Sequence, residues 1–199
     1  MPRSRLTIAA LATAGVAVLS ACSPSSQQSA STAPPAATSA SGTSAATPVK
    51  PPLLDPTAVD ISAPEQVAEA VAIASVTWDT TVHGSEYDAI RSVDALLTPE
   101  LAAAYAPVSE EGKAASDPMW ATARDLDAYN IPDVRTAQAN HHAPPDTATT
   151  IYRTYDATWT WHGTGGEMIH DPRTRYLYLT ITLQPDGRWL VSSFDVADI

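Results

Sequence analysis

Hydrophobic residues in the first half of the chain recur at the three- and four-residue spacing of helices that bury one face. Ser62 and Glu65 form a capping-box pattern and predict that the first helix begins there. Its apolar face is formed by Val67, Val71, Ala74, Trp78 and Val82. The pattern therefore predicts one helix that continues until Gly84 interrupts it.

Shorter helices are predicted to follow. Ser85 begins the second, over residues 85–97, and Thr98 is the expected N-cap of the third, over residues 98–105. A weaker fourth helix is predicted over residues 117–126. The first three of these helices follow one another closely and make up the first half of the predicted fold.

After Tyr129 the pattern changes to the alternation of antiparallel strands. The predicted strands cover residues 134–141, 149–162, 173–183 and 189–196, and the first of them is weak. Residues 173–183 alternate strictly, with Arg175, Leu177, Leu179, Ile181 and Leu183 on one face. Helices followed by strands predict an α+β fold, in which three N-terminal helices pack on a curved antiparallel sheet of about four strands.

The N-terminus has the pattern of an export signal. Arg3 and Arg5 precede a mostly apolar stretch over residues 6–19, which is too short for an ordinary spanning helix. It ends in Leu19-Ser20-Ala21-Cys22, which resembles the bacterial lipobox. The alternative is an incidental thiol in a short hydrophobic helix.

We expect residues 1–21 to be removed as a lipoprotein signal peptide. Cys22, the single cysteine of the chain, would then carry acyl chains such as palmitate. Two or more acyl chains hold a protein stably on a membrane. The expected location is the outer face of the cytoplasmic membrane, facing the cell wall.

Ser, Thr, Ala and Pro dominate the segment after Cys22. They account for 25 of the 30 residues from 23 to 52, and Lys50 is the only charged residue there. Such a composition buries too little apolar surface to offset its ordering entropy. We expect residues 22–59 to form a disordered tether and residues 60–199 to form one domain.

Acidic residues outnumber Lys and Arg by 22 to 11, which gives a net charge of −11. This balance argues against a protein that binds nucleic acid by neutralising phosphates. An acidic domain is also repelled by anionic lipid head groups. Arginine and alanine are frequent while lysine is nearly absent, a bias that points to the GC-rich genome of an actinobacterium.

Familiar catalytic motifs are missing from the sequence. It has no Gly-x-Ser-x-Gly elbow, no phosphate loop and no dinucleotide fingerprint. His162, Glu167, His170 and Asp171 crowd one hairpin end, and His141-His142 lie in another loop, but the spacing matches no known metal-ligand pattern. We therefore predict no catalytic residue, no metal and no cofactor.

Most aromatic residues lie after residue 150, on the predicted sheet. Trp159 and Trp161 have the same parity in one strand, so both point to one face. Together with Tyr155, Tyr176 and Tyr178, they are the candidates for a pocket or an interface. Such residues are core if their face meets the helices, line a pocket if the sheet leaves a cavity, and form a docking patch if they are exposed.

The order of elements and the last hairpin carry a resemblance to a known family. Residues 179–191 have the form aliphatic-Thr-Ile-Thr-Leu-x-x-Asp-Gly-Arg-Trp-x-Val. Over residues 62–196, the chain resembles the nuclear-transport-factor-two-like, or cystatin-like, domain, which implies a cone-shaped roll. Residues 77–80, Thr-Trp-Asp-Thr, and 97–101, Leu-Thr-Pro-Glu-Leu, resemble extracytoplasmic accessory proteins of actinobacterial mobile elements and conjugation systems.

Three functions are consistent with these patterns. The first is a lipid-anchored adaptor, not an enzyme, that docks to a membrane, secretion or conjugation complex through a protein partner in the cell envelope. The second is a carrier or sensor of a small apolar ligand inside the cone. The third is an acid–base enzyme similar to the isomerases and cyclases of that fold, with Asp79 or Asp156 as base and Tyr155, Tyr176 or Tyr178 as donor.

Overall fold

The computed structural model describes residues 48–105, 118–137 and 143–198. The expected signal peptide, Cys22 and most of the expected tether lie outside these ranges. The α-helices are α1 (Pro64–Ser75), α2 (Glu86–Arg91), α3 (Pro99–Ala104) and α5 (Pro118–Asp125), and the short 3-10 helices are η1 (Pro56–Ala58) and η2 (Asp94–Leu96). The strands are β1 (Tyr129–Thr136), β2 (Thr150–His162), β3 (Arg173–Leu183) and β4 (Trp189–Asp198). The predicted α+β class is confirmed.

The four strands form one antiparallel sheet in the order β1-β2-β3-β4, so each strand pairs with its neighbours in sequence. The register between β3 and β4 shifts between Thr180 and Ile181, which leaves Ser192 as an extra residue in β4. The Ser192 hydroxyl donates to the carbonyl oxygen of Thr180 at 3.2 Å, which ties the bulge to β3.

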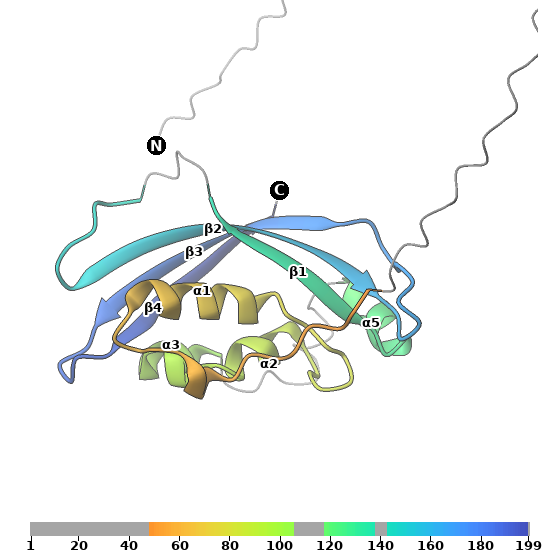
Figure 1. Ribbon diagram of the computed structural model, residues 1–199, viewed down its shortest axis with the longest axis horizontal. Coiled ribbons are helices and arrows are strands. Elements are labelled where there is room, and N and C mark those ends of the chain that lie inside the picture. The colour runs from red at the N-terminus through yellow and green to blue at the C-terminus, as the bar shows by residue number, and fades with distance from the viewer. Residues whose placement is uncertain (1–47, 106–117, 138–142, 199) are drawn as a thin grey trace, which may run out of the picture. The chain divides into compact units, whose positions relative to one another are not determined.

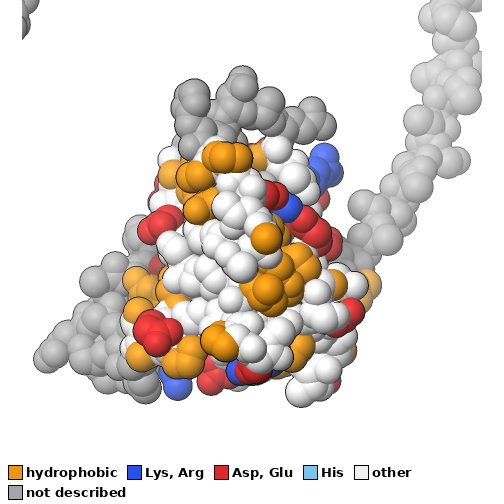
Figure 2. All heavy atoms as spheres, turned by 90° about the vertical axis from the view of Figure 1, so that its left-hand side faces the viewer, with side chains coloured by type: hydrophobic (Ala, Val, Ile, Leu, Met, Phe, Trp, Pro, Cys, Tyr) orange, Lys and Arg blue, Asp and Glu red, His pale blue; other side chains and the backbone are white. Residues whose placement is uncertain are grey.

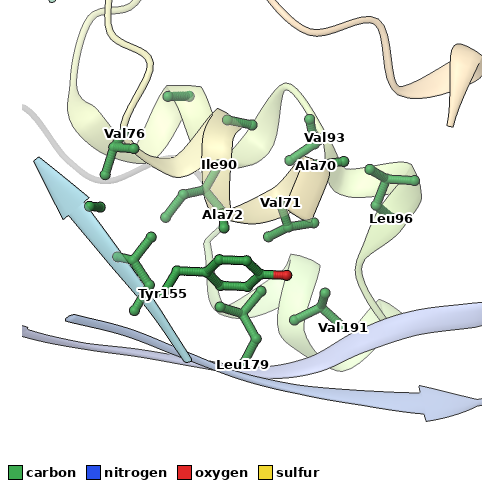
Figure 3. Close-up of a cluster of buried hydrophobic side chains, with 14 of the residues drawn as sticks. Ala70, Val71, Ala72, Val76, Ile90, Val93, Leu96, Tyr155, Leu179 and Val191 are labelled. Carbon is green, nitrogen blue, oxygen red and sulfur yellow. The ribbon is translucent and has the colours of Figure 1, made fainter. Parts of the chain in front are cut away.

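The helices cover one face of the sheet (Figure 1). Helix α1 lies against β2, β3 and β4, and α3 lies against β4. The core between these layers is built from alternate residues of the strands and from the apolar faces of the helices. Figure 3 shows the ring of Tyr155 between Val71 of α1 and Leu179 of β3.

The start and the end of α1 differ from the prediction. Its N-cap is Ala63, while the Ser62 hydroxyl donates to Asp60 at 2.7 Å and caps no helix. The helix ends at Ser75, before Trp78 and Val82. Tertiary pairing explains the early end, because the segment that follows α1 bonds to β1 and the chain leaves the helical path.

The next two helix starts are confirmed. Ser85 is the N-cap of α2, and its backbone N–H donates to the Asp88 carboxylate at 3.1 Å. Thr98 is the N-cap of α3, and its hydroxyl accepts from the Leu101 N–H at 3.4 Å. Local capping chemistry therefore placed both helix starts correctly, but α2 ends at Arg91 and not at residue 97.

The last three predicted strands agree with the structure to within two residues at each end, whereas the first does not. The bounds of β3 match the prediction at both ends, and β2 begins one residue later than expected. The first strand is Tyr129–Thr136 and not residues 134–141. Its two N-terminal residues, Tyr129 and Asn130, are buried, because they pair both with β2 and with the segment after α1.

Residues 48–59, within the segment expected to be a tether, make defined contacts with the fold. The Tyr129 hydroxyl donates to the Pro48 carbonyl at 3.1 Å, and Lys50 forms an ion pair with the buried Asp79. Leu54 and Val59 pack against the core. The last part of that segment thus lies along the domain in the structure.

Figure 2 shows the end of the fold that is at the left in Figure 1, where hydrophobic side chains lie in several patches among backbone, other uncharged side chains and a few charged side chains. Scattered apolar groups of this kind are normal on a protein surface.

Candidate functional site

The structure separates the five aromatic residues singled out in the sequence. Trp159, Trp161 and Tyr155 are buried on the face of β2 that meets the helices, so they belong to the core. Tyr176 and Tyr178 are half-buried on the opposite face of the sheet, with their ring centroids 6.3 Å apart. The five side chains cannot line a single pocket, because the sheet lies between the two groups.

Four tryptophans fill the interior near β1, at one edge of the sheet. The ring centroid of Trp78 lies 5.2 Å from that of Trp159 and 5.7 Å from that of Trp161. Trp120 of α5 meets Trp161 edge-to-face at 5.7 Å. Their four indole N–H groups are buried without a hydrogen-bond partner among the described residues, so aromatic contact is the main interaction of this cluster.

A cleft opens elsewhere, where α2 and the end of α3 meet the start of β3 and the end of β4. Its volume is about 280 Å³. We call it the aromatic cleft. It is lined by Ser75, Glu86, Tyr87, Ile90, Tyr105, Arg175, Phe194, Asp195 and Val196.

Tyr105 is the central ring of the cleft. Its ring centroid lies 6.2 Å from that of Tyr87 and 6.5 Å from that of Phe194. Burial raises the pKa of Tyr105 to about 12, and the nearby Asp195 and Tyr87 act in the same direction. The Tyr105 side chain is therefore protonated at neutral pH, and it contributes an uncharged ring and a neutral hydroxyl to the wall of the cleft.

Arg175 forms the inner side of the cleft and is 9% exposed. Its guanidinium carbon lies 4.7 Å from the ring centroid of Trp159 and 5.7 Å from that of Trp78. Its Nε donates to Asp198 at 3.1 Å, and Nη1 lies 3.7 Å from a carboxylate oxygen of Glu86. Two carboxylates and two indole faces thus compensate the buried charge.

The carboxylates considered as general bases lie away from this cleft. Asp79 is buried and accepts two hydrogen bonds from Thr81, at 2.6 Å from its hydroxyl and 3.0 Å from its N–H. Burial alone would raise the pKa of Asp79, but the Lys50 ammonium and the Thr81 hydrogen bonds hold it below the usual range. Asp156 points to the opposite face of β2, where one of its oxygens has no hydrogen-bond partner among the described residues.

The residues considered as metal ligands do not converge. Nδ1 of His162 lies 3.1 Å from the carbonyl oxygen of Gly166, and Nδ1 of His170 lies 2.8 Å from that of Asp171. Within residues 48–105, 118–137 and 143–198, no group of three His, Cys, Asp or Glu side chains could hold a metal ion. His141 and His142 lie outside the described residues.

The residues of the aromatic cleft were missed in the sequence, although one signal was present. Arg175 has the same parity as Leu177, Leu179 and Ile181 in β3, so a charged side chain was placed on the buried face. A charge at such a position needs compensating partners. The carboxylate partners of Arg175 come from α2 and β4. Both elements are distant from Arg175 in sequence, so no local sequence pattern predicts these partners.

Comparisons with protein-family models and with curated proteins yield no match for this chain. No helix in the part of the chain that the structure describes has the length and hydrophobicity needed to span a bilayer.

Proposed function

We propose that this protein is a lipid-anchored extracytoplasmic adaptor, and that its domain docks to a protein partner in the cell envelope through the aromatic cleft. The observation that carries the proposal is the cleft itself. It combines three aromatic rings with a compensated buried arginine, and aromatic and arginine residues are the types enriched where binding energy concentrates.

The anchor and tether are part of this proposal. Their support is the charged N-terminus, the apolar stretch and the lipobox pattern that ends in Cys22, followed by the segment rich in Ser, Thr, Ala and Pro. Anchoring confines the domain near the membrane and raises its effective concentration toward neighbouring complexes. An adaptor benefits from this arrangement without any catalytic group.

A cone-shaped, cystatin-like roll is also proposed, with three N-terminal helices against the sheet. Its support is the succession of α1, α2 and α3 before the strands, and the hairpin over residues 179–191. The resemblance of residues 77–80 and 97–101 to accessory proteins of conjugation systems suggests a secretion or conjugation complex as the partner assembly. Fold alone does not determine function, so this assignment depends on the test below.

The second candidate is a carrier or sensor of a small ligand in the same cleft. The observation in its favour is the volume of about 280 Å³, which is close to the lower limit for pockets that hold small molecules. Trp159 and Trp161, which could have lined a ligand cavity under this second hypothesis, are core residues. The adaptor is therefore preferred.

The test is affinity purification after chemical crosslinking in intact cells. The tag belongs in the Ser/Thr/Ala/Pro-rich segment, because Asp198 near the C-terminus bonds to Arg175 in the cleft. We expect a defined membrane complex that is lost with Cys22→Ala and with Phe194→Ala. Thermal unfolding of Phe194→Ala must show a folded protein. Recovery of the same proteins from all three chains, or of small molecules alone, would overturn the adaptor proposal.

A further inference from the structure

We propose that the aromatic cleft binds a cationic side chain, a lysine or arginine in a basic segment of the protein partner. The inference rests on the proposed docking function and names the chemistry of the partner. It follows from the charges around the cleft, from its aromatic walls and from its size.

Negative charge exceeds positive charge around the cleft. Glu86, Asp195 and Asp198 lie at or beside it, and Arg175 is the positive group among its lining residues. Arg175 is already engaged by two of these carboxylates and by the indole rings of Trp159 and Trp78. An incoming anion would meet the excess of carboxylates, whereas an incoming cation would be attracted by it.

The aromatic walls favour the same ligand. A cation is attracted to the face of an aromatic ring, and Tyr87, Tyr105 and Phe194 surround the space. Tyr105 presents both its ring and a hydroxyl oxygen that can accept a hydrogen bond from an ammonium or guanidinium group. Rings together with a rim carboxylate are a suitable environment for an alkylammonium or guanidinium group.

The size of the cleft limits what enters it. A volume of about 280 Å³ is small for a drug-sized ligand, but a long side chain can enter it while its backbone stays outside. Asp195 and Val196 are exposed at the end of β4, so a partner segment can reach the opening. The whole chain carries a net charge of −11, which adds long-range attraction for a basic partner.

The experiment measures peptide binding to the full chain in detergent by isothermal titration calorimetry. The probes are a short Gly–Ser peptide that carries lysines and two peptides in which glutamine or glutamate replaces the lysines. We expect the lysine peptide to bind at least about tenfold more tightly than the glutamine peptide. Its affinity should fall when NaCl is raised from about 50 mM to about 200 mM.

Two substitutions in the cleft test whether the lysine peptide binds there. Asp195→Asn should weaken lysine-peptide binding about threefold, and Phe194→Ala about fivefold. The matched control is Asp186→Asn, which removes the same charge at the turn between β3 and β4, at the opposite end of the hairpin from the cleft. It should leave the affinity unchanged.

Several results would overturn the inference. The inference fails if the lysine peptide does not bind, or if the glutamine or glutamate peptide binds equally or more tightly. It also fails if Asp186→Asn and Asp195→Asn weaken lysine-peptide binding equally. The docking function can still stand in these cases, if capture of the complex in cells depends on Phe194. Conversely, specific lysine-peptide binding without any captured complex would retain the cation site and overturn the adaptor role.

Discussion

The side chain of Asn130 in β1 bonds to the backbone of the segment that follows α1. Its side chain is fully buried, its amide oxygen accepts from the Trp78 N–H at 2.6 Å, and its amide nitrogen donates to the Val76 carbonyl. Its own N–H also donates to the Trp78 carbonyl at 2.9 Å. One residue of β1 therefore positions the tryptophan at the centre of the aromatic core.

We predict that Asn130→Ala lowers the free energy of unfolding by about 2–4 kcal/mol, because it leaves a buried N–H and a buried carbonyl without partners. Denaturant unfolding followed by fluorescence measures this loss. Thr136→Ala, at an exposed position of the same strand, is the control and should change stability by less than about 0.5 kcal/mol. Equal effects of the two substitutions would contradict this role of Asn130.

His83 makes stability depend on pH. It is buried, and its Nδ1 accepts from the Asp79 N–H at 3.2 Å. Burial lowers the pKa of His83, and Lys50 acts in the same direction, while Asp79 and Asp88 oppose the shift. The folded protein therefore favours the neutral imidazole.

The sign of the pH dependence follows from linkage. The stability gained from neutral His83 is present above the unfolded pKa of about 6.5 and is lost as the pH falls through the lower, folded value. We predict that the wild type loses more stability than His83→Gln between pH 7 and the acidic side of that transition. His170→Gln, at an exposed position, should behave like the wild type. Denaturant midpoints across this pH range provide the measurement, and parallel curves for wild type and His83→Gln would refute the prediction.

At the scale of elements, local signals predicted some boundaries and failed at others. The bounds of β3 follow from strict alternation, since buried and half-buried positions alternate through most of the strand. The helical spacing of Trp78 and Val82 wrongly predicted that α1 continues through both residues. Trp78 is buried outside the helix, where its backbone N–H donates to the Asn130 side chain. Val82 is 62% exposed, so its match to the apolar stripe was coincidental.

The start of α2 gives a prediction at this scale. The Asp88 carboxylate accepts from the Gly84 N–H at 2.8 Å and from the Ser85 N–H at 3.1 Å. Asp88→Ala should cost about 1 kcal/mol of unfolding free energy, as expected for a lost helix cap. Asp94→Ala removes a carboxylate from an exposed position in the first turn of η2 and should cost less than about 0.5 kcal/mol. A larger loss from Asp94→Ala than from Asp88→Ala would contradict the capping role.

At the scale of the whole molecule, the fold class could be predicted and the cleft could not. Helices followed by strands are visible in the periodicity. The aromatic cleft requires Tyr87 of α2, Tyr105 after α3 and Phe194 of β4 to meet around Arg175 of β3. Such a meeting depends on the packing of distant elements, which no single-sequence pattern encodes.

The proposed lipid anchor is also tested at the scale of the whole molecule. We predict that the chain sediments with membranes and that Cys22→Ala moves it to the soluble fraction, because the acyl chains supply the membrane affinity. Metabolic labelling with an alkyne palmitate analogue should mark the wild type alone. Membrane association that persists unchanged in Cys22→Ala would contradict the proposed anchor.

The most direct test of the docking claim is photo-crosslinking in intact cells from a single position at the cleft. Val196 of β4 lines the cleft and is 47% exposed, while Met168 is 58% exposed and lies between β2 and β3, where it pairs with His162. A photoreactive amino acid at position 196 should give a discrete adduct with one envelope protein, absent from position 168 and lost with Phe194→Ala. No adduct at position 196, or the same adduct from both positions, would contradict docking through the cleft.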